Sequence, residues 1–435
     1  MNEFVLGIGA CVFLIFFFLT GIEIAFGIAM IGIAGYALLS GFDAAYNLMV
    51  QDFFDVLSSY SLTVVPLFML MGQIAYNAGI AKRLYDAAYK LVGRVPGGLA
   101  MATVVAATLF KAMCGSTLAT AATFSSVAVP EMTRYKYSKK LSTGIVASVG
   151  TIGILIPPSI TMIIYGIMTE QSIGRLFLAG MIPGLLISLF FIGIIYAWCK
   201  IDPSLGPRST ETFTAREKLR SLPEFICVVI IFGIVIGGLM AGIFTPTESG
   251  TIGTIAVLIL ALSRKSLSFK GFVKSIDESL RAAVMVLILI ACSAVLGHFL
   301  TITQIPQFAG DWLVSLPLPR VLIMVVVFMF YLLGGSFIDD LAFMILVTPI
   351  LFPAVQKLGY DPIWFGVMIG VTLMVGTIIP PVAISVFVVK NITGESFKTV
   401  YTGVVPFLAS FVVAGALLFI FPGIATWLPT LLMGK

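Results

Sequence analysis

Charged residues and histidine are scarce in this chain of 435 residues. Only 10% of the residues are charged, one histidine is present, and 60% of the residues are hydrophobic. A soluble domain carries about 25% charged residues, so the composition excludes that class. It predicts an all-α polytopic membrane protein, since helices satisfy their backbone groups within lipid. The net charge of +5 is too small to indicate a nucleic-acid partner.

Catalytic and metal-binding motifs are also missing. The sequence contains no GxSxG, HExxH or GxxxxGK[ST] segment, so it predicts no catalytic residue and no cofactor. The five cysteines are widely scattered without a CxxC pair, which favours small core residues over disulfides or metal ligands. Because a phosphate-binding loop is lacking, the chain is not predicted to hydrolyse ATP, and active transport would need an ion gradient.

One pattern of glycines and prolines occurs twice in the sequence, 223 positions apart and without a gap. The residues repeated in this way are Gly153, Pro157, Pro158, Gly180 and Pro183, which return as Gly376, Pro380, Pro381, Gly403 and Pro406. Two adjacent prolines break a helix, because proline lacks the amide donor and clashes with the preceding turn. Broken backbone at membrane depth is tolerated only where protein buries it or a cavity adjoins it, so the paired breaks predict a transporter's binding site.

Apolar runs of about 20 residues predict about ten transmembrane helices. These runs lie near 4–20, 22–40, 61–81, 141–170, 176–199, 223–243, 249–263, 282–303, 361–390 and 400–421. Two further apolar stretches, 96–132 and 319–356, have Gly115-Ser116 and Gly335-Ser336 at their centres. The central Gly-Ser pairs favour two re-entrant hairpins, although a pair of full spans in either place would leave the same topology.

The basic residues indicate the orientation of these segments. In the predicted topology, 20 of the 25 Lys and Arg residues are cytoplasmic, and the positive-inside rule then predicts that both termini are external. Five crossings, an odd number, separate the hairpins, so the second half enters the membrane inverted. Each half is predicted to contain scaffold helices, an amphipathic surface arm, a hairpin and a broken helix. The first repeat, 1–222, has these last three at 82–94, 96–132 and 141–170; the second, 223–435, has them at 266–281, 319–356 and 361–390.

The tip of the first hairpin is rich in oxygen ligands. It faces the broken helix in the predicted fold, and its carbonyl and hydroxyl oxygens can replace the water shell of Na⁺, a hard cation. The first predicted Na⁺ site consists of Gly115, Ser116, Thr117, Thr151, Gly153 and Pro157. For the hydroxyls of Thr123, Ser125 and Ser126, close packing between helices is the favoured alternative.

Two adjacent aspartates, Asp339 and Asp340, follow Gly335-Ser336 in the second hairpin. A carboxylate at membrane depth is expensive unless it faces water, a cation or a partner, so it indicates function. The alternative is a helix N-cap, which is equally open for one aspartate. Because neighbouring residues point to different sides, Asp339 is assigned to an ion site and Asp340 to the cavity. The second predicted Na⁺ site consists of Gly335, Ser336, Asp339, Gly376, Thr377 and Pro381.

The N-termini of hairpin arms and half-helices would present amides to the midplane, which suits a carboxylate substrate. Residues predicted to line the substrate pocket are Thr120, Thr123, Ser159, Thr161, Asp340, Ser385 and Asn391. For Ser159, Thr161, Ser385 and Asn391, satisfaction of nearby backbone groups is the favoured alternative. For Lys111, snorkelling towards the cytoplasm is favoured over pairing with a substrate or an aspartate. For His298, a packed neutral ring is favoured over a proton relay, because no acidic residue is near in sequence.

Four segments carry a resemblance to a known family: CGSTLATAATFSSVAVPEM, GTIGILIPPSITMIIYG, AGIFTPTESG and VGTIIPPVAISVFVV, in that order. They resemble the DctM-type large membrane subunit of tripartite ATP-independent periplasmic (TRAP) transporters over nearly the whole chain. The resemblance implies an elevator-type architecture of the ion-transporter superfamily, in which hairpins and broken helices slide past a scaffold. Lys111 and Cys114 depart from the family, in which small uncharged residues more often precede the Gly-Ser tip.

The resemblance also implies partners and a location. It implies Na⁺ coupling, a separate small membrane subunit of four helices, and a periplasmic binding protein that delivers a carboxylate such as a C4-dicarboxylate or sialic acid. The lipid bilayer would be the bacterial inner membrane. A stand-alone carrier of the divalent anion:Na⁺ symporter type shares the inverted-repeat plan and is the alternative. An intramembrane enzyme would need a nucleophile or metal set, and only Asp339 with Asp340 offers a carboxylate pair.

Overall fold

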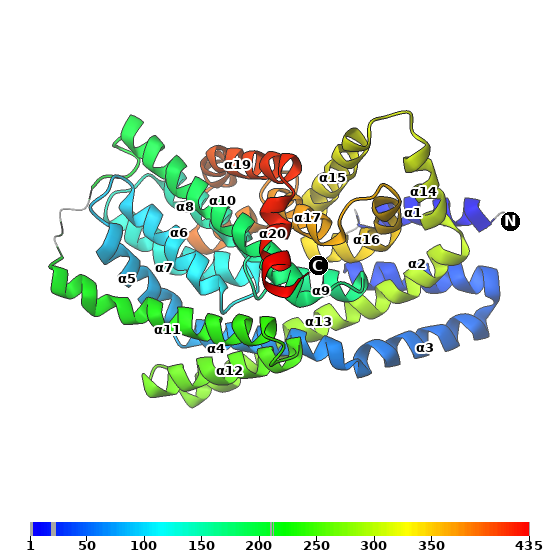
Figure 1. Cartoon of the computed structure of the whole chain (residues 1–435), viewed down its shortest axis with the longest axis horizontal. Helices are drawn as coiled ribbons and strands as arrows, with labels where there is room; N and C mark the ends of the chain where they lie inside the picture. The colour runs from blue at the N-terminus through cyan, green and yellow to red at the C-terminus, as the bar shows by residue number, and fades with distance from the viewer. Residues whose placement is uncertain (1–2, 19–22, 209–210, 212, 435) are drawn as a thin grey trace.

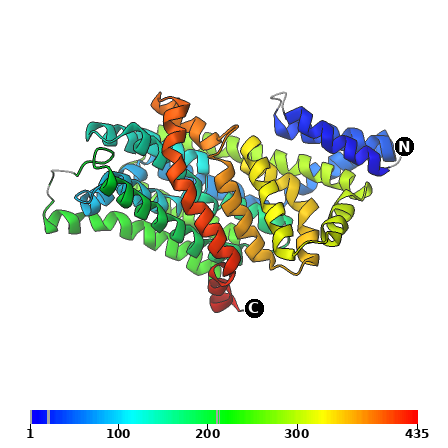
Figure 2. The ribbon, with the colours of Figure 1, turned by 90° about the horizontal axis from the view of Figure 1, so that it is seen from above.

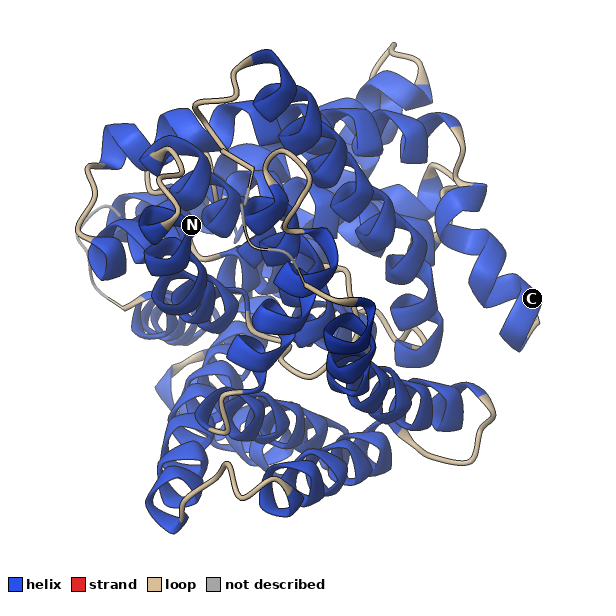
Figure 3. Ribbon diagram, turned by 90° about the vertical axis from the view of Figure 1, so that its left-hand side faces the viewer, coloured by secondary structure: helices blue, strands red, loops and turns tan. Residues whose placement is uncertain are grey.

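Every regular element among the residues that the computed structural model describes is a helix. The structure describes residues 3–18, 23–208, 211 and 213–434, and these form twenty α-helices and two short 3-10 helices (Figure 3). Seven described helices are long and apolar enough to cross a membrane, or eight if the bent pair α3 and α4 is one span. The predicted all-α polytopic class is confirmed. Five of these seven helices are predicted crossings, namely Ile173–Ile201, Ala215–Met240, Pro246–Ser263, Phe269–Ile302 and Phe397–Ile420, and the other two, Arg320–Phe337 and Asp340–Lys357, are the arms of the second hairpin. Of the remaining predicted crossings, three have helices shorter than 18 residues and two are broken into half-helices.

Most of the helices of the two halves correspond in order along the chain. Those of the first half are α1 (Glu3–Phe18), α2 (Ile24–Ser40), α3 (Phe42–Ser58), α4 (Val64–Asn77), α5 (Ile80–Val92), α6 (Gly98–Lys111), α7 (Thr117–Arg134), α8 (Lys139–Thr151), α9 (Ile160–Met168) and α10 (Ile173–Ile201). Those of the second are α11 (Ala215–Met240), α12 (Pro246–Ser263), α13 (Phe269–Ile302), α14 (Ile305–Ser315), α15 (Arg320–Phe337), α16 (Asp340–Lys357), α17 (Pro362–Gly376), α18 (Ile384–Thr393), α19 (Phe397–Ile420) and α20 (Gly423–Met433). A shift of 223 residues carries α7 onto α16 with both bounds unchanged.

The two predicted surface arms have different outcomes. Segment 82–94 lies largely in α5, a separate helix that packs against α6. Segment 266–281 forms instead the first part of α13, which continues unbroken to Ile302, so the prediction of a separate arm there is wrong. The same shift carries α5 onto α14, which is therefore its counterpart in the second half. Shifted back by 223 residues, segment 266–281 corresponds to 43–58 in α3. A break separates α3 from α4, but α13 has no break at the corresponding place, so the charges of 266–281 do not mark a separate helix.

Helices of the two halves exchange neighbours. In one layer α4 packs against α12, α2 packs against α13, and α4 and α13 pack against each other. Above this layer in Figure 1 lie the hairpins and broken helices, where α7 packs against α18 and α16 against α9. Likewise α8 packs against α19 and α10 against α17. These reciprocal pairs are the packing expected of an inverted repeat, and they bring the two hairpins into one body.

The repeated glycines make the helix crossings close. At the α8–α19 crossing, a Cβ atom on Gly144 would collide with the backbone of Gly403, and one on Gly403 would collide with the Lys140 carbonyl. A Cβ atom on Gly180 would collide with the Leu155 carbonyl in the same way. Small residues at helix interfaces allow such backbone approach in membrane proteins. Gly180 and Gly403, which correspond in the repeat, therefore both seat a long span on backbone from a broken helix.

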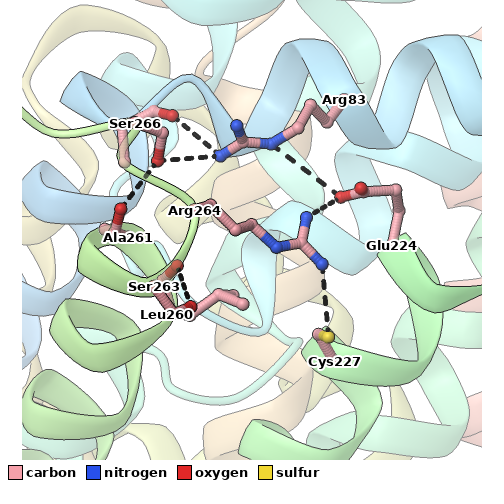
Figure 4. Close-up of polar contacts among 9 residues, drawn as sticks. Arg83, Glu224, Cys227, Leu260, Ala261, Ser263, Arg264 and Ser266 are labelled. Carbon is pink, nitrogen blue, oxygen red and sulfur yellow. Dashed lines mark hydrogen bonds and ion pairs between the residues drawn. The ribbon is translucent and has the colours of Figure 1, made fainter.

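The arm α5 is fixed to the scaffold by a charged cluster. Arg83 Nε lies 3.8 Å from the carboxylate of Glu224 on α11, and Arg264 at the end of α12 donates to the same carboxylate (Figure 4). Arg264 Nη2 also lies 3.3 Å from Cys227 Sγ, and Arg83 Nη2 donates to Ser266 Oγ at 3.2 Å. One carboxylate thus joins three helices.

Seen from above, α1 and α2 lie together at one end of the molecule, remote from α20 (Figure 2).

Candidate functional site

The first hairpin turns between α6 and α7, where Ser116 organises the backbone. Its Oγ accepts a hydrogen bond from the amide of Ala119 at 3.3 Å and so caps α7. Its carbonyl oxygen accepts from Lys111 Nζ at 2.7 Å and from Thr120 Oγ1 at 3.1 Å. Lys111 ends α6, and its side chain has no exposed surface. The snorkelling predicted for Lys111 is therefore wrong, because its ammonium turns inward to the Ser116 carbonyl.

This first tip meets the first break, as the sequence predicts. A Cβ atom on Gly115 would lie 2.8 Å from the Pro158 carbonyl oxygen, and one on Gly153 would collide with the end of the Lys111 side chain. Lys111 is also near enough to Asp340 for the two charges to interact. The whole break, 152–160, is buried. The ammonium thus lies within the predicted cage, on the side that faces the second hairpin.

The second hairpin turns later than predicted. Gly335 and Ser336 lie in the last turn of α15, and the turn itself is Ile338 and Asp339, so the prediction of a Gly335-Ser336 tip is wrong. Asp339 Oδ1 accepts from the amides of Leu341 and Ala342 at 3.2 and 3.3 Å and caps α16. The 223-residue shift carries Ser116 onto Asp339. The gapless repeat was the signal that could have located the tip, in place of the matching Gly-Ser letters.

The second tip also lies against its break. A Cβ atom on Gly376 would lie 2.8 Å from the Gly335 carbonyl carbon. The Ser336 carbonyl accepts from the amide of Val382 at 3.1 Å, on the far side of the break. The Thr377 carbonyl accepts from the Ser385 amide at 3.0 Å. Four of the six residues of the second predicted ion site thus come together through their backbones.

Several side chains predicted to line the substrate pocket are instead bound to their own backbone. The hydroxyls of Thr120, Thr123 and Ser159 donate to carbonyls of nearby residues at 3.1, 2.6 and 2.6 Å. Thr161 is buried on α9 and Asn391 is exposed on α18. Ser385 differs from these, because it is fully buried and its Oγ has no hydrogen-bond partner among the described residues.

The two half-helices that follow the breaks, α9 and α18, differ in whether a side chain caps their N-terminus. Ser159 caps α9 by accepting from the amide of Met162 at 3.3 Å. The cap position of α18 is Ala383, whose side chain forms no cap, and Pro380, Pro381 and Val382 before it are exposed. Pro381 therefore lies at an exposed edge of the second predicted ion site. Amides at a helix N-terminus attract anions. Of the two half-helices, α18 is the one without a side-chain cap among the described residues, although the Ser385 amide in its first turn already donates to the Thr377 carbonyl.

His298 has a partner that its sequence neighbourhood does not reveal. Its Nε2 lies 3.2 Å from Asp52 Oδ1 on α3, and its side chain is 54% exposed. The interpretation as a packed histidine is wrong, because about half of the side chain is exposed. Both residues lie in the scaffold layer, on α13 and α3. His298 is therefore outside the two tip-and-break units, each of which consists of one hairpin tip and the broken helix that it meets.

Two capped hairpins facing two broken helices, related by an inverted repeat, define a polytopic membrane transport protein. The chain belongs to the family of the DctM component of the tripartite ATP-independent periplasmic transporter, whose model matches residues 11–424. This confirms the resemblance found in the four sequence segments, and with it the permease class and the multi-pass membrane location.

Individual relatives are similar over nearly their full lengths. The C4-dicarboxylate TRAP transporter large permease protein DctM of Pseudomonas aeruginosa is 34% identical over 395 residues, which cover 90% of this chain and 91% of that protein. The sialic acid TRAP transporter large permease protein SiaM of Vibrio cholerae is 31% identical over 415 residues, covering 95% and 96%.

The fold is also similar to a solved structure. The YdaH transporter of Alcanivorax borkumensis superposes with a TM-score of 0.65 over 99% of this chain and 100% of that one. The identity is 14%, so this likeness concerns the fold alone.

Proposed function

We propose that this chain is the large membrane subunit of a Na⁺-coupled TRAP transporter that imports a small organic acid by an elevator movement. The observation that carries the proposal is the second tip-and-break unit, where Asp339 and Asp340 lie at a hairpin turn beside a broken helix. Carboxylate and carbonyl oxygens together suit a hard monovalent cation. Gly335, Ser336, Gly376 and Thr377 supply the carbonyls, and Asp339 supplies the charge.

The substrate carboxylate binds at the N-terminus of α18. The amides there have no side-chain cap, and the Ser385 hydroxyl beside them has no protein partner among the described residues. Asp340 lies on the adjoining hairpin and interacts electrostatically with Lys111, which offsets its repulsion of an anion. Names of relatives support C4-dicarboxylates and sialic acid as the substrate class.

The elevator movement carries both hairpins and both broken helices past the layer of α4, α12 and α13. Reciprocal packing of α7 on α18 and of α16 on α9 supports this, because it joins the two units into one body. Separate partners complete the transporter, namely a small membrane subunit of four helices and a periplasmic binding protein. The bacterial inner membrane is the proposed location, with both termini in the periplasm.

Reconstitution in liposomes tests this function. The chain is combined with a small subunit and a binding protein of the TRAP type, and uptake of labelled succinate and sialic acid is measured with and without an inward Na⁺ gradient. We expect uptake of one of them only when all three proteins and the gradient are present. Uptake by the chain alone would identify the stand-alone carrier instead, and uptake that ignores Na⁺ would remove the coupling.

A further inference from the structure

The first predicted Na⁺ site already contains a positive charge from the protein. Lys111 Nζ donates to the Ser116 carbonyl at 2.7 Å, the oxygen that a Na⁺ ion at this tip would need. The same side chain fills the space above Gly153, where even a Cβ atom would collide with it. Ser116 and Gly153 both belong to the first predicted Na⁺ site. The cage therefore does not fit a free cation while Lys111 keeps this position.

Because Lys111 is buried, its ammonium depends on partners within the protein. The Lys111 side chain has no exposed surface, and a buried charge is tolerated only when it is paired and hydrogen-bonded. The Ser116 carbonyl supplies a hydrogen bond, and Asp340 supplies an opposite charge across the two hairpins. Lys111 is also the last residue of α6, where the helix dipole favours a cation. Three independent features thus hold a positive charge at this tip.

The second unit has no such residue. The position that corresponds to Lys111 is Gly334, and the cap that corresponds to Ser116 is the carboxylate of Asp339. Opposite the break, Gly376 faces the backbone of Gly335 and not a charged side chain. The second unit therefore has acidic oxygens and lacks a cation of its own.

We propose that the ammonium of Lys111 takes the place of a coupling ion in the first repeat, so that only the second repeat binds and releases Na⁺. This inference rests on the proposed Na⁺ coupling. A fixed charge cannot dissociate, so it stabilises the first tip in every state of the transport cycle and contributes nothing to the coupling ratio. Like charges so close repel strongly in a buried setting, so a Na⁺ ion and the Lys111 ammonium do not share the Ser116 carbonyl.

The number of bound Na⁺ ions tests this substitution. Equilibrium binding of ²²Na⁺ is measured on the purified permease complex for the wild type, Lys111→Ala, Lys111→Met and Asp339→Asn. At a Na⁺ concentration that just saturates the wild type, we expect one ion per wild-type chain, well below one for Asp339→Asn, and two for Lys111→Ala, in which the cage is vacated. Lys111→Met fills the same space without a charge and is expected to stay at one, and Lys90→Met on α5 is the matched surface control.

The outcomes separate the inference from the function on which it rests. Two ions per wild-type chain, or one ion in both the wild type and Lys111→Ala, would overturn the role of Lys111 and leave Na⁺ coupling intact. No bound ion in the wild type, with uptake indifferent to Na⁺, would overturn the coupling itself. The ratio of charge to substrate, taken from the reversal potential of the wild-type complex in liposomes, needs no variant. It is expected to correspond to a single Na⁺, and a value that requires two would also sink the substitution.

Discussion

The two tip-and-break units share one backbone plan and carry opposite charges. At corresponding positions the first has Lys111, Ser116 and Thr117, and the second has Gly334, Asp339 and Asp340. At these three positions the first unit therefore has one cation and no acid, and the second has two acids and no cation. The two halves of an inverted repeat can share a backbone arrangement and still differ in function. Here the positive charge of Lys111 and the negative charge of Asp340 interact between the two hairpins.

The breaks themselves differ in the same direction. In the first half all of 152–160 is buried and Ser159 caps the following helix. In the second half Pro380, Pro381 and Val382 are exposed and α18 begins without a side-chain cap. Groups that are satisfied within the protein have little reason to bind a ligand, whereas unsatisfied groups do. The comparison supports the proposal that ligands bind in the second unit.

Asparagine at the two corresponding caps gives the strongest test of this difference. Asp339→Asn keeps a capping side chain and removes the charge, so the Na⁺ concentration for half-maximal uptake is expected to rise about 10- to 100-fold, the loss of one charge-assisted interaction. Ser116→Asn produces the same cap in the first unit and is expected to change this value less than about twofold. Equal effects of the two variants on the Na⁺ titration would contradict the division of roles.

Alanine at the two break glycines tests what each glycine faces. Gly153→Ala collides with the Lys111 side chain and Gly376→Ala with the backbone of Gly335, so each is expected to destabilise the protein by about 1–3 kcal/mol. The double variant Gly153→Ala/Lys111→Ala is expected to recover most of the loss, which thermal unfolding in detergent measures as a double-mutant cycle. Gly376→Ala has no side chain whose removal could rescue it. Additive losses in the double variant would show that Lys111 does not lie over Gly153.

Two buried serines after the breaks separate a structural hydroxyl from a binding one. Ser159→Ala removes the cap of α9 and is expected to cost about 0.5–2 kcal/mol of stability. Ser385→Ala removes a hydroxyl without a partner among the described residues, so stability should change by less than about 0.5 kcal/mol. Its effect should appear instead as a raised KM for substrate uptake. If Ser385→Ala destabilised the protein and left KM unchanged, the carboxylate would not bind there.

The two arms give the smallest expected difference. Arg83 on α5 joins a partly buried cluster with Glu224, whereas Asp311 on α14 pairs with Lys357 in an exposed position. Arg83→Ala is expected to lower stability by about 1 kcal/mol, and Asp311→Ala by no more than about half of that, since exposed ion pairs contribute little. Melting temperatures of the two variants at low and high salt check the order, and a larger loss for Asp311→Ala would reverse it.

Periodic and repeated features allowed most of the fold to be predicted from the sequence. The gapless shift of 223 residues and the two Pro-Pro breaks predicted the halves, the broken helices and their meeting with the hairpin tips. The second tip was misplaced because the letters Gly335-Ser336 were matched to Gly115-Ser116, although the shift itself pairs Ser116 with Asp339. The arm at 266–281 failed because surface charge does not show where a helix ends.

Side-chain direction and distant contacts could not be predicted in this way. A lysine side chain at the end of a helix has several low-energy rotamers. The local sequence does not determine whether its ammonium points to solvent or to the carbonyl of Ser116. The pair of His298 with Asp52 joins residues on α13 and α3, which no short-range pattern connects. The Na⁺ ligands and the orientation in the membrane stay predictions.

The close crossing of α8 and α19 has a consequence for how the chain is made. The glycine contact of Gly144 with Gly403 joins the first broken helix to the last long span. A ribosome that has produced only the first half has therefore not yet supplied the surface on which α8 rests, nor α18 for α7. The first hairpin must wait in the membrane, incompletely packed, until translation is nearly finished. Variants that leave the mature protein stable but slow synthesis of the second half would expose this interval to membrane proteases.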